Sequence, residues 1–231
     1  MIRTTFLDHS GFLVELPSVT LLFDWWKGEL PSLRENVPLL VFSSHWHEDH
    51  FNPAIFNLNA DAYILGEMQP DWLRRKGVSS EKIEQSISLS GNDSVAPLPG
   101  VTVETLPSTD EGVAFLVTAD GLTVFHAGDL NWWHWEGEPD PWNPDMAVHF
   151  QQYAEPLRNR HIHLAMLPLD PRLNKDGFRG ANHFLRLARI DRFIPMHQWG
   201  KFAFTEQFLA CYPEFTEKTM PVTHKGQVFE F

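Results

Sequence analysis

A short stretch of this chain concentrates side chains that can bind metal ions. Residues 44–50 read Ser-His-Trp-His-Glu-Asp-His and directly follow an apolar run. Imidazole nitrogens and carboxylate oxygens are the ligands that divalent first-row metals prefer. His45 and His47 lie two residues apart and can point into one site, whereas Asp49 and His50 would serve a neighbouring position. A solvated loop could hold such residues by chance, but three histidines at this density favour a metal site.

Polar residues also follow other apolar runs along the chain. Asp24, Asp129 and His197 each come where such a run ends, and residues 108–110 (Ser-Thr-Asp) are a further candidate. Proteins of the α/β class gather site residues at strand ends on one side of a sheet. A single Asp or His at a strand end is more often a satisfied structural residue. Beside the histidine-rich loop, the group as a whole predicts one shared site.

The elements that must position these residues alternate between hairpin-rich segments and helices. Strands are predicted at residues 2–7, 11–16, 19–23, 38–43, 62–65, 83–89, 101–106, 112–118, 122–125, 161–169, 192–196 and 227–231. Helices are predicted after residues 52–53 and at 69–76, 144–160 (with Asn143 as its cap), 182–190 and 205–211.

This order suits an α/β fold of four layers, in which two mixed β-sheets pack face to face and helices flank them. Periodicity alone does not distinguish this arrangement from other α/β architectures. No repeat, low-complexity tract or linker interrupts residues 1–231, so we expect a single domain.

Composition narrows the classes of function. The net charge of −12 would repel a nucleic-acid backbone, so a polynucleotide partner or a nuclease activity is disfavoured. The single cysteine, Cys211, excludes an intrachain disulfide and suits a reducing compartment. The N-terminal segment has neither a signal-peptide pattern nor an apolar spanning stretch. We therefore expect a soluble, cytoplasmic protein with no membrane partner.

The motif His-Trp-His-Glu-Asp-His at residues 45–50 resembles the H-x-H-x-D-H signature of the metallo-β-lactamase superfamily. Other elements follow in that superfamily's order: Asp24 closing a strand, Gly-Asp at residues 128–129, and a strand-end His197. The opening Asp-His-Ser-Gly-Phe-Leu-Val-Glu at residues 8–15 is similar to that of the small lactonase-like hydrolases within it. The resemblance implies an αββα sandwich that carries one or two metal ions.

The resemblance also implies a set of ligands. The first ion would be bound by His45 and His47, and the second by Asp49, His50 and His197. Asp129 would bridge the two ions. The expected metal is zinc, with Mn²⁺ or Fe²⁺ as alternatives.

The chain departs from the superfamily pattern at one ligand. A third histidine for the first ion usually follows a strand like that at 101–106, but residues 106–112 contain none. Asp110 is the natural substitute, because a carboxylate oxygen binds zinc at a similar distance. Alternatively, Ser108 and Thr109 only line the pocket, and the first position is weak or empty. His9 lies in the opening motif at residues 8–15. A role in supporting the metal ligands from behind and a purely structural role are equally expected for it.

Such a site would hydrolyse a small molecule without a side-chain nucleophile. Divalent ions lower the pKa of bound water and polarise a carbonyl or phosphoryl oxygen. Asp49 would orient the attacking water, which makes it the candidate catalytic residue. An ester, lactone, amide or phosphoester bond is the expected target, and no Gly-x-Ser-x-Gly element supports covalent catalysis.

Most of the nine tryptophans lie beside predicted site residues, and four of them fall in the thirteen residues after Asp129. Residues 131–143 read as an ordered loop at the mouth of a pocket. The residues expected to line the substrate pocket are Trp132, Trp133, His134, Trp135 and Arg172, the last as an anchor for a carboxylate or phosphate. The alternative is that these rings seal the fold or form a contact in a homo-oligomer.

Two further functions remain open at this point. The first is a redox protein that uses iron at the same ligands. The absence of a flavin- or nucleotide-binding motif argues against it. The second is a non-catalytic binding protein with a degenerate first metal position, which the missing histidine suggests.

Overall fold

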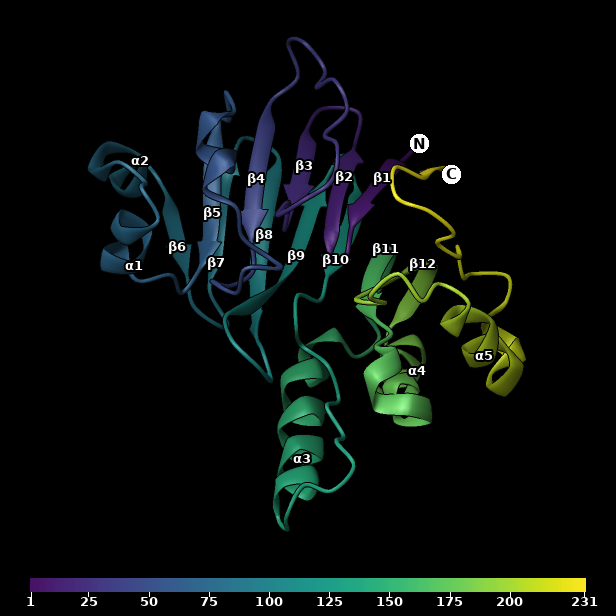
Figure 1. Ribbon diagram of the computed structural model, residues 1–231. Helices are drawn as coiled ribbons and strands as arrows, with labels where there is room; N and C mark the ends of the chain where they lie inside the picture. The colour runs from purple at the N-terminus through teal and green to yellow at the C-terminus, as the bar shows by residue number, and fades with distance from the viewer.

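The computed structural model describes residues 1–231, which form two mixed β-sheets packed face to face (Figure 1). The seven-stranded sheet has the order β13-β1-β2-β3-β4-β5-β6, and the six-stranded sheet has the order β12-β11-β10-β9-β8-β7. The seven strands of the first sheet are β1 (Arg3–Asp8), β2 (Gly11–Glu15), β3 (Thr20–Phe23), β4 (Leu39–Ser43), β5 (Ala62–Gly66), β6 (Ile87–Leu89) and β13 (Val228–Glu230). The six strands of the second are β7 (Ser94–Leu98), β8 (Val101–Pro107), β9 (Val113–Ala119), β10 (Leu122–His126), β11 (His161–Pro168) and β12 (Arg189–Met196).

Helices cover the outer face of each sheet. The α-helices are α1 (Pro70–Arg75), α2 (Ser80–Glu84), α3 (Trp142–Ala154), α4 (Arg179–Leu187) and α5 (Phe204–Cys211). The 3₁₀ segments are η1 (Pro53–Asn57), η2 (Glu155–Leu157), η3 (Pro171–Phe178) and η4 (Pro213–Phe215). The first two α-helices and η1 lie on the first sheet, and the other three α-helices lie on the second (Figure 1). The αββα sandwich expected from the sequence is confirmed. None of the helices is both long and apolar enough to cross a membrane.

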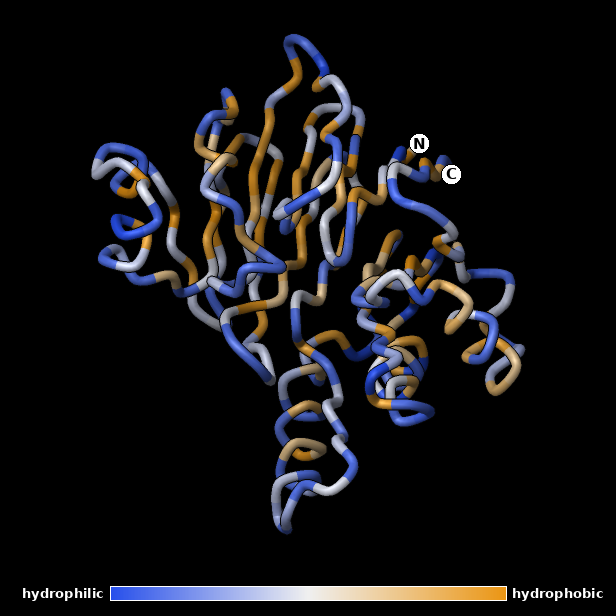
Figure 2. Tube along the Cα trace, viewed as in Figure 1, coloured by the Kyte–Doolittle hydropathy of each residue, from blue (hydrophilic) through white to orange (hydrophobic).

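The strands of the first sheet bury both faces, each against a different layer. In β3, Leu21 and Phe23 join the main core between the sheets, whereas Leu22 joins the smaller cluster beneath η1 and α1. Between the sheets the Phe23 and Phe42 rings stack at 4.6 Å, and Phe42 meets Phe115 edge-on at 5.1 Å. Figure 2 shows hydrophobic residues concentrated along the strands and hydrophilic residues in the connecting loops. Continuous apolar runs therefore become strands that are buried on both sides.

Turn residues close the hairpins as the sequence predicts. Asp120 and Gly121 have φ angles of 55° and 72°, which suit a tight turn between β9 and β10. Asn52 accepts a hydrogen bond from Ala54 N at 2.9 Å and so caps η1, although that segment is 3₁₀ rather than α-helical. The termini lie side by side because β13 pairs with β1 (Figure 1).

The helix predicted at residues 144–160 is displaced at both ends. It begins at Trp142 and its α-helical part ends at Ala154, after which Pro156 lies in a 3₁₀ turn. A proline nitrogen cannot donate the next helical hydrogen bond. Asn143 is not the cap, because its amide instead bonds Trp135 N at 3.0 Å and Trp135 O at 2.8 Å. This pair of bonds fixes the tryptophan-rich loop to the start of α3.

Other differences lie at sheet edges and element ends. The strand predicted at 83–89 begins only at Ile87, because Ser79 accepts a hydrogen bond from Lys82 N and starts helix α2. The edge strand β7 was not predicted, since its Pro97 is atypical of strands except at edges. The helix predicted at 182–190 starts and ends three residues earlier, and β12 begins at Arg189.

Candidate metal centre

The predicted site residues meet where several strands end at one edge of the sandwich. Asp24 follows β3, the histidine-rich loop follows β4, Asp129 follows β10, and His197 follows β12. Asp110 lies in the turn between β8 and β9. The structure arranges the side chains of this region that could bind metal into two adjacent groups.

The first group contains His45, His47, Asp110 and Asp129, whose candidate ligand atoms all lie within 4.8 Å of one another. His45 Nε2 is 3.0 Å from His47 Nδ1 and 3.8 Å from Asp129 Oδ2. His47 Nδ1 is 3.6 Å from Asp110 Oδ2. Asp110 is therefore placed where a substitute for the missing histidine would have to lie.

The second group contains His9, Asp49, His50 and His197, again with all candidate ligand atoms within 4.8 Å. His9 Nε2 lies 3.3 Å from Asp49 Oδ2, so the His9 ring lies among the candidate ligands rather than behind them. His9 has a φ angle of 54°, and its carbonyl oxygen accepts a hydrogen bond from His197 N. The opening motif was the only sequence signal for this residue.

Asp129 stands between the two groups with one oxygen toward each. Its Oδ1 lies 3.3 Å from His50 Nε2 and 3.5 Å from His197 Nε2. Its Oδ2 lies toward His45 Nε2. This is the geometry that a bridging carboxylate requires.

Buried carboxylates fix the orientation of the histidine rings. Asp24 Oδ2 accepts hydrogen bonds from His50 Nδ1 at 2.7 Å and from Ser44 Oγ at 2.6 Å. Since the Ser44 proton points to Asp24, Ser44 Oγ accepts from His45 Nδ1 at 2.9 Å. Asp170 Oδ2 accepts from His197 Nδ1 at 2.8 Å. All three rings consequently present Nε2 to the shared centre.

Glycines allow the ligand loops to approach one another closely. A Cβ atom on Gly112 would lie 2.0 Å from Ser44 O, and one on Gly128 would lie 2.9 Å from Ser44 Cβ. Both glycines have positive φ angles, of 68° and 52° respectively. Only glycine satisfies both demands, so these positions hold the Asp110 and Asp129 segments against the loop after β4.

Several buried atoms at the centre lack any hydrogen-bond partner. They are His50 Nε2, His9 Nε2 and Asp129 Oδ1. Buried polar atoms are nearly always paired, so three orphans converging on one place indicate a missing partner. A divalent cation fits, because imidazole nitrogens and carboxylate oxygens surround the place.

The electrostatics of the centre agree with that fit. Burial lowers the pKa of His45 to about 3, and burial with the nearby His197 lowers the pKa of His9 to about 4. Both rings are therefore neutral near pH 7 and keep a lone pair. Burial alone would lower the pKa of His50, but the carboxylates of Asp129 and Asp24 raise it well above its ordinary value. A cation at the centre would take the place of that proton.

The two groups open into a pocket of about 310 Å³. Apart from the candidate ligands, the residues that line it are Thr109, Trp133, Trp135, Trp142, Met146 and Arg172. Trp133 and Trp135 lie parallel with centroids 6.3 Å apart, and Trp133 Nε1 donates to Asp129 O at 3.0 Å. Trp142 belongs to the stretch expected at the pocket mouth, whereas Met146, from the second turn of α3, was not among the predicted pocket residues.

Two predicted pocket residues do not line this pocket. Trp132 points to the other side of its loop, where it packs against Phe150 at 5.7 Å and His183 at 6.2 Å. His134 is also absent from the pocket wall. The loop at residues 131–135 has no regular period, so the sequence did not indicate which side chains face the centre.

Arg172 lines the pocket, but contacts with other side chains of the protein hold its guanidinium in place. Its guanidinium lies over the rings of Trp135 at 5.3 Å and Trp199 at 4.7 Å. Its Nε and Nη2 donate to both oxygens of Asp170, at 3.0 and 2.6 Å. Burial would raise the pKa of Asp170, but His197 and Arg172 lower it to about 2. Arg172 therefore secures the carboxylate that orients His197, while its Nη1 keeps no protein partner.

Comparison with known proteins agrees with this arrangement. Residues 3–135 match the model of a family described as a beta-lactamase superfamily domain. A UPF0173 metal-dependent hydrolase of Opitutus terrae is 31% identical over 160 residues, which cover 55% of this chain and 62% of that relative, less than two thirds of its length. A UPF0173 metal-dependent hydrolase of Desulforamulus reducens is 26% identical over 212 residues, covering 84% of this chain and 83% of the relative.

Solved structures share the fold. Igni18, a metallo hydrolase from Ignicoccus hospitalis, superposes with a TM-score of 0.64 at 22% identity and covers 100% of this chain and 99% of its own. CmlA, a diiron β-hydroxylase from Streptomyces venezuelae, has a TM-score of 0.63 at 11% identity over 100% of this chain and 54% of its own. At these identities the likeness extends to the fold alone.

Proposed function

The chain belongs to the beta-lactamase superfamily, whose model matches more than half of it, and from this premise we propose that it is a metal-dependent hydrolase of small molecules. The relatives named metal-dependent hydrolases support the reaction class. The observation that carries the proposal is the buried Asp129, with one unpartnered oxygen facing His50 and His197 and the other directed to His45.

Each group would hold one divalent ion. His45, His47 and Asp110 would bind the first, His50, His197, Asp49 and His9 would surround the second, and Asp129 would bridge them. When bound, divalent ions supply Lewis acidity that lowers the pKa of water and polarises the carbonyl or phosphoryl group under attack. Zinc is the expected ion, since a mixture of imidazole and carboxylate ligands suits it.

Asp49 is the residue that we propose positions the attacking water. Its side chain is partly exposed to the pocket, with Oδ2 3.3 Å from His9 Nε2. Burial would raise the pKa of Asp49, but the neighbouring His9 and His50 hold it well below its ordinary value. The carboxylate is therefore ionised near pH 7 and can hold and orient the attacking water.

The pocket limits the substrate to a small molecule. Its volume of about 310 Å³ lies at the lower end of the range for small-ligand sites, and three tryptophans form much of its wall. These rings exclude water and offer flat apolar surfaces for stacking. An ester, lactone, amide or phosphoester carried by a compact apolar or aromatic group fits this wall.

Metal analysis combined with a hydrolysis panel tests the proposal. Purified protein is expected to contain one or two divalent ions per chain and to hydrolyse at least one of a set of esters, lactones, amides and phosphodiesters. Asp129→Asn should abolish both metal retention and hydrolysis, whereas the matched exposed change Asp71→Asn on α1 should leave both unchanged. A wild-type rate of hydrolysis in the Asp129→Asn variant would show that the reaction takes place at another site.

Iron chemistry is the second candidate at the same ligands. The first group combines two histidines with two carboxylates, a donor set that also suits iron. Bound iron with oxygen uptake, and no hydrolysis of the panel, would replace the hydrolase by a redox function.

A further inference from the structure

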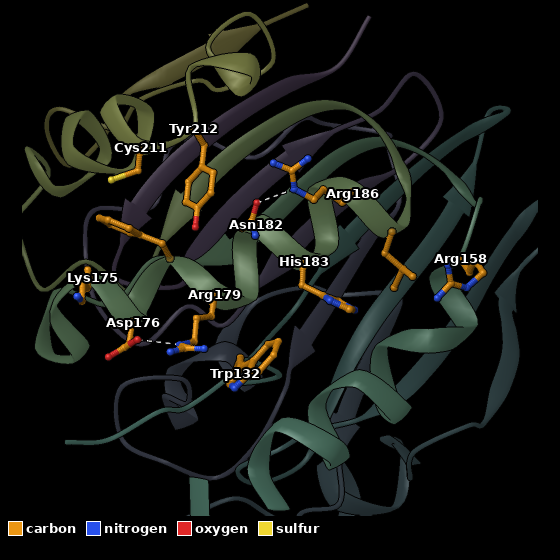
Figure 3. A pocket seen from close by; sticks show the side chains of 12 residues that line it. Trp132, Arg158, Lys175, Asp176, Arg179, Asn182, His183, Arg186, Cys211 and Tyr212 are labelled. Atoms are coloured by element: carbon orange, nitrogen blue, oxygen red, sulfur yellow. Dashed lines mark hydrogen bonds and ion pairs between the residues drawn. The ribbon is translucent and has the colours of Figure 1, made fainter. Parts of the chain in front are cut away.

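A second cleft lies on the other side of the loop at residues 131–135. It has a volume of about 630 Å³, and α4 forms much of its wall (Figure 3). Trp132 faces this cleft, whereas the next residue, Trp133, faces the metal centre. The cleft and the metal pocket share no lining residue. Any ligand of this cleft is therefore distinct from a substrate at the metals.

The cleft gathers positive charge in an acidic protein. Four basic residues line it against one acidic residue, Asp176, although the whole chain has a net charge of −12. The basic residues are Arg158, Lys175, Arg179 and Arg186. In Figure 3, Arg179 and Arg186 extend from α4, Lys175 lies at the left of the view, and Tyr212 lies above Arg179. Arg179 and Arg186 are seven residues apart, so they lie on one face of the helix.

Ion pairs hold the arginines in place without using all their donors. Arg179 bonds Asp176 Oδ1 only through Nε, at 2.8 Å. Arg186 uses Nε for Asn182 Oδ1 and Nη2 for Glu214. Since a guanidinium has five N–H donors, both side chains retain donors without a protein partner.

Charge counting leaves an excess on the cleft. Arg158 pairs with Glu155, so each of the three arginines has one carboxylate partner. Lys175 has no ion-pair or hydrogen-bond partner and carries the remaining positive charge. Burial and the nearby Arg158 lower the pKa of His183, so its ring adds no charge near pH 7. Surface ion pairs contribute little to stability, so stability alone does not explain gathering these cations around a hollow.

We propose that this cleft binds a small, multiply charged oxyanion such as a phosphate ester. Guanidinium forks bind oxyanions through paired charge-assisted hydrogen bonds, and a lysine adds a point charge. The Tyr212 ring provides a flat surface for an organic part of the ligand, while the Trp132 ring, 5.6 Å from the Arg179 guanidinium, supports that arginine from beneath. The carboxylates that pair with the arginines keep the side chains ordered before the ligand arrives, which lowers the entropy lost on binding.

The only cysteine of the chain supplies a reporter at this place. Cys211 is exposed and lines the cleft. The test measures the rate at which iodoacetamide, a neutral reagent, alkylates the full-length protein at increasing inorganic pyrophosphate. Metal-loaded and chelator-treated samples are compared, because pyrophosphate also binds metal ions. Saturable slowing of alkylation in both samples is expected.

Three variants locate the effect. Lys175→Gln and Arg179→Gln should each raise the pyrophosphate concentration for half-maximal slowing by about tenfold, as expected for the loss of one charge-assisted hydrogen bond. Arg75→Gln, which removes an equal charge on α1 of the opposite layer, should leave it unchanged. Absence of slowing, equal slowing in the three variants, or loss of slowing on metal removal would overturn the proposal. None of these outcomes bears on hydrolysis at the metal centre.

Discussion

Asp110 is the residue that most distinguishes this centre from the superfamily pattern. The sequence lacks the third histidine of the first group, and the structure places the Asp110 carboxylate 3.6 Å from His47 Nδ1. Burial, and next the charge of Asp129, raise the pKa of Asp110 above its ordinary value, so both desolvation and repulsion between the two carboxylates disfavour its charged form without a cation. A bound ion would relieve that repulsion.

Replacing Asp110 tests this assignment. Asp110→Ala should weaken binding of the first ion by about 100-fold and leave one ion per chain. Asp110→His should restore two ions, because imidazole is the usual ligand at this position of the superfamily. The adjacent change Glu111→Ala, which removes only a bond to Trp46 Nε1, should keep the wild-type stoichiometry. Metal content after gel filtration measures all three, and two ions in Asp110→Ala would exclude Asp110 as a ligand.

Arg172 acts on the second group through another side chain. It binds both oxygens of Asp170, and Asp170 orients His197. Arg172→Gln should lower the affinity for the second ion by about tenfold, whereas Arg172→Lys should recover part of it by keeping the charge on Asp170. Competition with a coloured chelator measures the affinity. An unchanged affinity in Arg172→Gln would limit Arg172 to the pocket wall.

At the scale of elements, the centre depends on turns that bring strand ends together. The turn between β8 and β9 carries Asp110 and reaches the loop after β4 because Gly112 has no side chain. Gly112→Ala places a Cβ atom 2.0 Å from Ser44 O at a φ angle of 68°. The strain and the overlap together should lower the free energy of unfolding by roughly 3 kcal/mol and disrupt the first metal group.

A second glycine provides the matched control. Gly77→Ala has a similar φ angle of 86° but nothing within 4 Å of the new Cβ atom. It should lower the free energy of unfolding by only about 1 kcal/mol and leave metal content unchanged. Urea unfolding of both variants measures the two changes in the free energy of unfolding. Equal destabilisation would mean that backbone strain, rather than the approach to Ser44, is what Gly112 relieves.

Features that depend on neighbouring residues in the sequence could be predicted, whereas features that depend on contacts within the folded chain could not. Apolar runs such as 38–42 and the Asp120-Gly121 turn predicted strands and hairpins because burial and turn geometry act locally. The motif at residues 45–50 and the acidic residues at strand ends located the centre because they, too, are recognised within short stretches of sequence. The face of Trp132 and the bond from Asn143 to Trp135 depend on contacts formed only in the folded loop. Likewise, the bonds that join Arg172, Asp170 and His197 have no periodic signature.

At the scale of the whole molecule, the centre closes one edge of the sandwich. Strands β3 and β4 of the first sheet and β10 and β12 of the second all end at it. Ions that bind Asp129 would also join the loops that follow these strands. Metal binding is therefore expected to stabilise the fold as well as to support the reaction.

Removal of metal should lower the thermal stability of the protein. An ion at 100 times its dissociation constant stabilises the folded state by about 2.7 kcal/mol. For a chain of this size that corresponds to a fall in Tm of roughly 5–10 °C after chelation. The Asp129→Asn variant should unfold at the same temperature with and without chelator. A chelator effect that persists in this variant would come from metal bound elsewhere.

The stabilisation by metal should also increase with pH. In the metal-free protein Asp129 and Asp24 raise the pKa of His50 well above its ordinary value, so His50 is protonated near pH 7. That proton stabilises the metal-free fold fully below about pH 6.5, and its contribution is lost as the pH rises through the raised pKa of folded His50. A metal ion must displace the proton, so its affinity should rise by about tenfold per pH unit over this range. Calorimetry in buffers of different ionisation enthalpy measures the proton released, and release of none near pH 7 would mean that His50 is not a ligand.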